Sequence, residues 1–303
     1  AADRRWIQQA LPLGRRAPDW ARRMYVRSLL VLRALTHSRS GASVAGARDH
    51  WAYVWPRDAG AAAIALAAAG YGTEARRVVG FLLGLDLGAG ARFRGDSSAV
   101  ADGRVLPGDA VGWIRAAAEA TEARAPRPRA GAWRDSGDYG ERRGDRGEYL
   151  ANAIAGGAQA SEIRRLFAAP TGLQRRAGDR DSGLDSSAAW AVRPFSRPQL
   201  FGLVRTTLLA LEAEAGRFGI TPSQDWPGGE AWTAPAAWSA WSLAALGERS
   251  AALRLMATLR RSSTRAGMIP ERVSPANGLP LSTTPLGWTH AFALLALRRL
   301  YPR

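Results

Sequence analysis

Cysteine and lysine are both absent from this chain of 303 residues. Without cysteine the chain forms no disulfide bond and offers no thiolate to a metal ion, so its redox compartment stays open. Histidine is scarce as well: His37, His50 and His290 are spaced too widely for a zinc site. No apolar run reaches the length of about 18 residues that a membrane-spanning helix needs, so we expect no membrane span.

Because lysine is absent, all 42 basic residues are arginines, and they outnumber the 26 acidic residues to give a net charge of +16. An excess of this size is typical of proteins that bind nucleic acid or an anionic surface. The arginines are nevertheless spread along the chain as short pairs, and the sequence contains no nucleic-acid recognition motif. We therefore expect neither a nucleic-acid partner nor a membrane partner.

Hydrophobic residues make up 47% of the sequence and recur with a helical period almost throughout, whereas the alternating pattern of strands is nearly missing. This pattern predicts an all-α protein. The segments 59–70 and 232–246 are apolar on more than one face, which predicts helices buried between neighbours. Helices are expected at residues 19–36, 58–69, 73–85, 108–122, 148–155, 158–167, 185–192, 198–215, 233–246, 250–258 and 289–300.

Helix and loop alternate at intervals of about 45 to 50 residues, which is the rhythm of an α/α toroid. In such a toroid six helical hairpins form an inner and an outer ring, so the sequence predicts an (α/α)6 barrel. No linker rich in proline, serine or charge divides the chain, and we expect one domain over residues 1–303, with residues 1–18 as an N-terminal extension. Loops at one end of the inner ring are expected to converge on a central pit.

The segment 49–59 reads DHWAYVWPRDA and gathers aromatic and charged side chains. The proline directly before Arg57 suits the first position of a helix, so Arg57 and Asp58 are expected at a helix start. Flat aromatic rings stack on sugar faces while charged groups hold sugar hydroxyls, so this segment fits a sugar site. The alternative is that Arg57 and Asp58 form only an ion pair at the end of a helix.

Two glutamates stand in predicted loops. Glu141 lies in GDYGERRG, which is rich in glycine and charged residues, and Glu271 lies in GMIPERVSPANG, which is rich in proline and glycine. Glycoside hydrolysis requires two carboxyl groups, one protonated to donate to the leaving oxygen and one ionised to activate a water. In an inverting enzyme the two groups stand about 6.5 to 9.5 Å apart, which leaves room for that water. The alternative is that both loops are solvated connections between helices.

Four segments occur in the order seen in glycoside hydrolase family 15, the family of glucoamylases, glucodextranases and bacterial trehalase-like enzymes. They are YVWPRDA (53–59), DYGERRG (138–144), GGEAWTAP (228–235) and MIPERVSPANGLPLSTTPLGWTHA (268–291). The chain resembles this family from about Trp20 onward, in a compact form without the N-terminal β-sandwich of many bacterial members. The resemblance implies an (α/α)6 barrel and an inverting, exo-acting α-glucosidase that releases β-glucose from non-reducing ends. It implies a small α-glucoside as the substrate and neither a metal nor a cofactor.

By position in the matched segments, the resemblance assigns Glu271 as the general base and Glu141 as the general acid. Arg57 and Asp58 correspond to the clamp on the terminal glucose. The other substrate-binding residues that it implies are Trp51, Tyr53, Trp55, Asp138, Tyr139, Arg142, Trp232 and Trp288. His290 is expected to hold the base loop by hydrogen bonds rather than to polarise a group beside the base. Asp225 and Glu230 are further, weaker pocket candidates.

Three features depart from the family pattern. Gly140 replaces the tryptophan that usually precedes the general acid, and Ile220 stands where the family often carries an arginine, with Arg217 nearby. The stretch 109–133 is short, which predicts a trimmed or missing barrel helix. The alternative function is therefore a carbohydrate-binding pseudoenzyme with weak or no hydrolysis.

The linkage preference, substrate length and oligomeric state stay open. The compartment also stays open: because the sequence begins at Ala1 rather than at methionine, both an exported mature form and a cytoplasmic protein are consistent with it.

Overall fold

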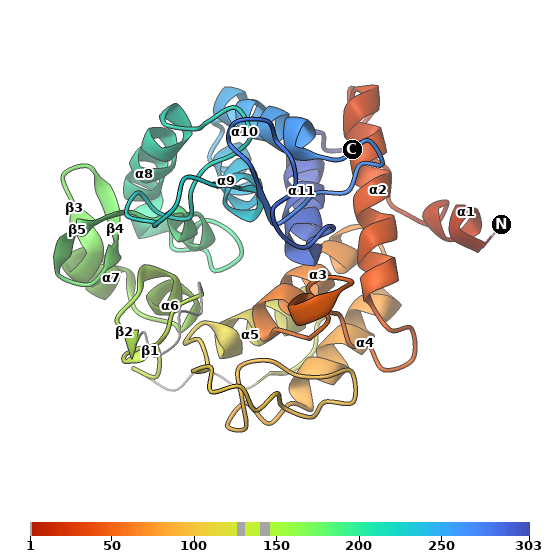
Figure 1. Ribbon diagram of the computed structural model, residues 1–303, viewed down its shortest axis with the longest axis horizontal. Helices are drawn as coiled ribbons and strands as arrows, with labels where there is room; N and C mark the ends of the chain where they lie inside the picture. Colours follow the sequence, from red (N-terminus) through yellow and green to blue (C-terminus); the bar gives the residue numbers. More distant parts are fainter. Residues whose placement is uncertain (1, 126–130, 140–145) are drawn as a thin grey trace.

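A computed structural model describes residues 2–125, 131–139 and 146–303 of the chain, and its helices form a closed ring (Figure 1). Each inner element packs on the next, and the last packs on the first, so the ring closes. In chain order the inner elements are α3 (Pro56–Ala68), α5 (Ala110–Ala120), α6 (Leu150–Ala155), η2 (Ser186–Ala191), α9 (Thr233–Ala245) and α11 (Gly287–Leu300). The predicted all-α barrel is confirmed.

A second layer of helices covers the outside of this ring. Each outer helix packs against an inner element and buries one face, as α4 does with Ala75, Val78, Val79 and Leu82. The outer helices are α2 (Asp19–Leu35), α4 (Gly72–Leu83), α7 (Ala160–Phe167), α8 (Phe201–Ala213) and α10 (Arg249–Ser262). Between α5 and α6 the described residues contain no outer helix, in agreement with the short stretch noted in the sequence.

Small residues allow the inner helices to approach closely. A Cβ atom at Gly112 in α5 would lie 2.1 Å from the carbonyl oxygen of Ala155 in α6, so only glycine fits there. At the centre Trp113, Trp190 and Trp238 meet in edge-to-face contacts with ring centroids 5.1 and 5.5 Å apart. This arrangement fills the ring with aromatic side chains at a packing geometry that favours the ring quadrupoles.

The structure corrects three details of the predicted helices. Residues 186–191 form the 3-10 helix η2 instead of an α-helix, and its start is capped by Asp185, which accepts a hydrogen bond from the backbone nitrogen of Ser187. Helix α10 continues four residues beyond the predicted end. Residues 168–184, expected as a loop, contain a three-stranded antiparallel sheet made of β3 (Ala168–Ala169), β4 (Gly172–Arg176) and β5 (Asp179–Leu184).

The first residues of the chain contribute to the same core. Helix α1 (Ala2–Ile7) places Trp6 on Tyr71, with ring centroids 3.9 Å apart, and the Trp6 indole nitrogen donates to Glu74.

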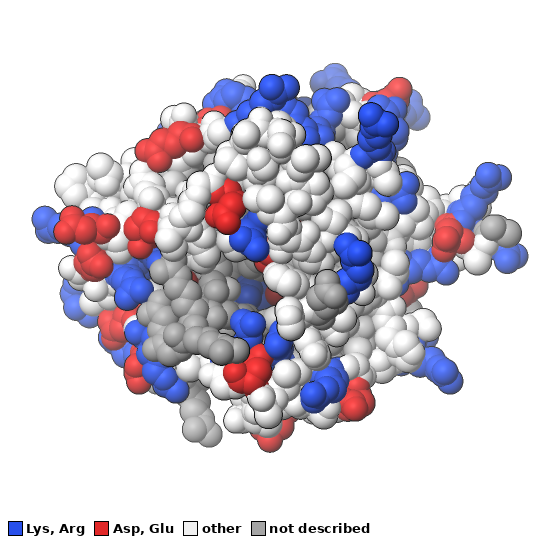
Figure 2. Space-filling view, viewed as in Figure 1, with Lys and Arg blue, Asp and Glu red and all other residues white. Residues whose placement is uncertain are grey.

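Figure 2 shows basic and acidic side chains interspersed over the visible face, with arginines densest along the edge above α10. Across the described residues, none of the helices has both the length and the apolar character required to cross a membrane.

The inner elements bring their N-terminal ends together, because each is preceded by a loop on the same face of the ring. Short elements lie in these loops: η1 (Asp49–Trp51) before α3, and the strand pairs β1 (Ser136–Gly137) with β2 (Arg146–Gly147) and β6 (Ala231–Trp232) with β7 (Arg272–Val273). The 3-10 helix η3 (Pro198–Leu200) precedes the outer helix α8. The loops converge on a central pit, as predicted.

Candidate active site

A cavity of about 220 Å3 lies at the N-terminal ends of the inner elements. Eight of the residues singled out from the sequence line it: Trp51, Trp55, Arg57, Asp58, Tyr139, Trp232, Glu271 and Trp288. These residues come from four separate loops, so the fold brings together side chains that are up to 237 positions apart in the chain, from Trp51 to Trp288. The cavity is the candidate active site.

Glu271 is partly buried in the wall of the cavity, and both of its carboxylate oxygens accept a hydrogen bond. Oε1 accepts a hydrogen bond of 3.3 Å from the indole nitrogen of Trp51, and Oε2 accepts one from the hydroxyl of Ser282. Burial raises the pKa of Glu271, while the contacts from Ser282, Arg272 and Trp51 oppose that rise. A carboxylate has about four lone-pair sites, more than its contacts with Trp51, Ser282 and Arg272 require, so it can also hold a water. Its environment therefore suits a base that must be ionised and yet basic.

The loop that carries Glu271 is fixed at both of its ends. The backbone carbonyl of Glu271 accepts from the backbone nitrogen of Thr233 at 3.1 Å, and its nitrogen donates to the carbonyl of Thr283 at 3.0 Å. Beyond β7 the chain turns back on itself, because the nitrogen of Ser274 donates to the carbonyl of Leu279 at 2.9 Å. The base is thus held by backbone hydrogen bonds between two loops.

His290, in the first turn of α11, holds the same loop through a hydrogen bond to its backbone. Its Nε2 accepts a hydrogen bond of 3.0 Å from the backbone nitrogen of Ile269, so the ring proton sits on Nδ1, which lies 3.0 Å from the hydroxyl of Ser28. Burial, followed by the nearby charge of Arg27, lowers the pKa of His290 to about 3. The ring is neutral and supports the base loop, as the sequence predicted.

The neutral histidine makes stability depend on pH. The folded pKa of His290, about 3, lies below the unfolded value of 6.5, so its contribution is complete above pH 6.5 and declines as the pH falls toward 3. From pH 7 to pH 5 we expect the native chain to lose about 2 kcal/mol more free energy of unfolding than the variant His290→Gln. Glutamine keeps an acceptor for Ile269. Urea unfolding at both pH values measures the difference, and equal losses in the two proteins would contradict it.

Arg57 and Asp58 lie in the first turn of α3 and are almost fully buried. Nη1 of Arg57 contacts Asp109 at 3.1 Å, Nη2 donates to the carbonyl of Tyr139 at 3.4 Å, and the guanidinium lies 4.9 Å from the ring centre of Trp288. The nearest contact between Arg57 and Asp58 is 3.9 Å, from Nε to Oδ2. Asp109 therefore lies closer to Arg57 than Asp58 does, and both predicted clamp residues line the cavity.

Solved structures of other proteins share the fold of this chain. No family model and no curated protein matches the sequence. A wild-type glycosidase is 19% identical, covers 94% of this chain and 98% of its own, and superimposes with a TM-score of 0.77. A bacterial glucoamylase complexed with acarbose is 14% identical over 98% of this chain and 57% of its own, with a TM-score of 0.73. The glucoamylase from Saccharomycopsis fibuligera is 11% identical over 92% and 94%, with a TM-score of 0.68.

The chain has the glucoamylase fold. Within this fold, two of the predicted substrate-binding residues lie away from the cavity wall. Tyr53 packs edge-on against Trp55 and beneath the guanidinium of Arg92, at 4.4 Å, and is not among the described lining residues. Asp138 is buried against Arg175 instead of facing the cavity. Glu141 and Arg142 lie outside the described residues, so their assigned roles stay predictions.

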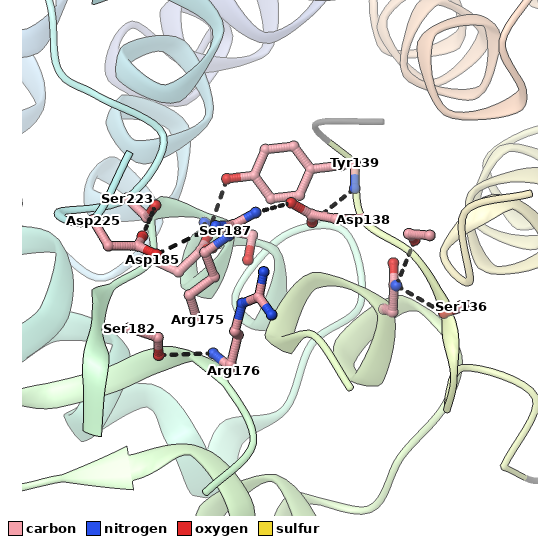
Figure 3. A network of polar contacts seen from close by, with 12 residues as sticks. Ser136, Asp138, Tyr139, Arg175, Arg176, Ser182, Asp185, Ser187, Ser223 and Asp225 are labelled. Carbon is pink, nitrogen blue, oxygen red and sulfur yellow. Dashed lines mark hydrogen bonds and ion pairs between the residues drawn. The ribbon is translucent and has the colours of Figure 1, made fainter. Parts of the chain in front are cut away.

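Asp138 belongs to a buried polar network behind the cavity (Figure 3). Arg175, on β4, donates to Asp138, lies 3.3 Å from Asp225 and 3.9 Å from Asp185. Burial and the charge of Asp138 raise the pKa of Asp185 to about 7, although Arg175 opposes the rise. The hydroxyl of Tyr139 donates to Asp185 at 3.4 Å. Tyr139 lines the cavity, so its contact with Asp185 ties one wall of the cavity to this network.

Sequence reasoning missed half of the cavity wall. Trp226 stands just before the matched segment 228–235, and Trp238 follows it in α9. The many tryptophans between residues 226 and 241 were the signal that could have identified both. Arg272 directly follows the base, whereas Arg217, next to the position where the family often carries an arginine, is exposed and packs on Phe218. The missed lining residues are Ala45, His50, Arg104, Pro222, Trp226, Pro235, Trp238, Arg272 and Leu286.

Proposed function

We propose that this protein is a member of glycoside hydrolase family 15 and an inverting, exo-acting hydrolase of short α-glucosides. The observation that carries the proposal is the partly buried carboxylate of Glu271, held between Trp51 and Ser282 in the wall of a cavity that also contains Arg57 and Asp58. The glucoamylase fold supports it, because described residues from all four matched sequence segments line the cavity.

In the proposed mechanism Glu271 is the general base. A water bound to one of its free lone pairs attacks the anomeric carbon, and its proton passes to the carboxylate as the bond to the leaving oxygen breaks. Attack from the face opposite the leaving group gives β-glucose from an α-glucoside. The hydrogen bonds from Trp51 and Ser282 fix the carboxylate in one orientation, so that little reorganisation is needed during the reaction.

Glu141 is the proposed general acid that protonates the leaving oxygen. The assignment rests on its place in the matched segment, three residues after Asp138, and it predicts a separation of about 6.5 to 9.5 Å between the carboxyl groups of Glu141 and Glu271. Tyr139 is fixed at the wall by its contact with Asp185, so the chain enters the proposed acid loop from an anchored point.

Substrate size follows from the cavity and from the ligands of the similar structures. A volume of about 220 Å3 is below the usual range of about 300 to 1,000 Å3 for pockets that enclose drug-sized ligands, and suits one sugar ring. One glycosidase of similar structure was solved with glucose and one glucoamylase with acarbose. We infer that the cavity holds the terminal glucose, with Asp58 and Arg57 at its hydroxyls and the tryptophans at its faces.

The test is a substrate panel of maltose, maltotriose, isomaltose, dextran and trehalose, read by glucose release and by NMR of the first anomer formed. We expect β-glucose to appear first from at least one of these sugars. Initial α-glucose would overturn the inverting mechanism. If every substrate is left intact while glucose still binds, the protein is a carbohydrate-binding pseudoenzyme, the function that the replacement of the usual tryptophan by Gly140 favours.

A further inference from the structure

Among the residues that the structure describes, Arg272 forms an ion pair with the proposed base. Its Nε lies 3.6 Å from Oε2 of Glu271, and its Nη1 donates to Oε1 of Glu230 at 3.1 Å. Its guanidinium also lies 5.3 Å from the ring centre of Trp232, another wall of the cavity. One cation is therefore fixed between two carboxylates and an aromatic face, which restricts it to a single position.

The backbone around Arg272 is built to hold this position. Strands β6 and β7 pair Trp232 with Arg272 directly, so the two side chains lie on the same side of the strand pair. Glu230 has room because Gly228, at a φ of +96°, carries no side chain, and a Cβ atom there would lie 2.4 Å from Oε2 of Glu230. The ion pair of Glu230 with Arg272 is thus supported by chain geometry on both sides.

The cation also has an electrostatic effect on the base. Burial raises the pKa of Glu271, and the charge of Arg272 is one of the contacts that lower it again. The side chain of Arg272 is 28% exposed, so solvent screens this effect only in part. The other charged or titratable residues that line the cavity, among those described, are His50, Arg57, Asp58, Arg104 and Tyr139.

We infer that Arg272, tethered by Glu230, is a positioning residue that orients the carboxylate of Glu271 and keeps it ionised. The inference rests on the proposed role of Glu271 as the base. It assigns a task to a side chain that the sequence analysis passed over, and it explains how a partly buried glutamate can remain ionised beside a single arginine among the described residues. Arg57 is committed to Asp109 and Tyr139.

The experiment follows the ionisation of Glu271 directly. Because the indole nitrogen of Trp51 donates to Glu271, its NMR resonance reports the charge of that carboxyl. The resonance is assigned by its loss in Trp51→Phe among the 12 tryptophans. We expect the titration midpoint to rise by about one pH unit in Arg272→Gln, since an opposite charge at this distance lowers a carboxyl pKa by at least that much. Arg272→Lys keeps the positive charge, so its titration midpoint should stay close to that of the native protein.

Two controls separate this role from general effects. Arg265→Gln removes an equal charge from an exposed turn and is expected to leave the midpoint unchanged. In an active enzyme, the acid limb of kcat/KM should move to higher pH in Arg272→Gln together with the NMR midpoint. A midpoint that stays within about 0.2 units of the native value in Arg272→Gln would overturn the inference. If the native protein releases no glucose, the proposed function fails, while the titration still decides the role of Arg272.

Discussion

Replacement of Glu271 by glutamine is expected to reduce glucose release by at least about 1,000-fold while glucose binding changes by only a few-fold. Glutamine has the same shape and can still accept the hydrogen bond from Trp51, but it cannot take a proton from water. The loss should therefore appear in kcat, with little change in affinity. Coupled glucose assays measure the rate, and isothermal titration with glucose measures binding.

A matched control for this variant is Glu119→Gln, the same chemical change on an exposed helix residue that pairs with Arg115. It should retain native turnover. If Glu271→Gln kept more than about a tenth of the native rate, Glu271 could not be the base, because base catalysis supplies about 100-fold or more.

Replacement of Arg175 by methionine should lower the free energy of unfolding by about 3 to 5 kcal/mol at pH 8. The guanidinium is fully buried, and its removal leaves Asp138 and Asp185 without a counter-charge in the protein interior. Burial already raises the pKa of Asp185, and without Arg175 that rise is no longer opposed, so stability is retained at low pH and lost as the pH rises. The deficit should be smaller at pH 5 than at pH 8.

Urea unfolding followed by tryptophan fluorescence at the two pH values measures this effect. Adding Asp138→Asn to the Arg175 variant removes one unpaired charge and should restore part of the lost stability. Arg254→Met, which removes an arginine paired with Glu212 at the surface, serves as the control and should change stability far less. A deficit for Arg175→Met that matches this control, or that is equal at both pH values, would contradict the argument.

The helices of the barrel were readable from the sequence because their apolar residues repeat with a helical period over ten or more positions. The ring itself was predicted from the alternation of helix and loop at intervals of about 45 to 50 residues. Segments such as 59–70, which are apolar on several faces, predicted only that their helices lie between neighbours. The 3-10 geometry of residues 186–191 was not readable, since six residues of small and apolar side chains fit either helix type.

The site was predictable where side-chain direction depends on local structure alone. Arg57 and Asp58 reach the cavity because a proline places them in the first turn of α3. Arg272 was not predictable, because β6 and β7 contain two residues each, and strands so short have no alternation to read. Asp138 was misplaced for a different reason: its partner Arg175 is 37 residues away on a hairpin that lacks an apolar pattern.

The turn beyond β7 separates the base from the tip of its loop. The residues at 275–277 are exposed, while the strand pair and His290 hold the segment that contains Glu271. Leu279 and Leu281, just after the tip, are 62% and 50% exposed, although leucine usually avoids water. Insertions at 275–277 should therefore lengthen the exposed tip without moving the base. The loop can vary in length at this point while the residue proposed to activate water keeps its place.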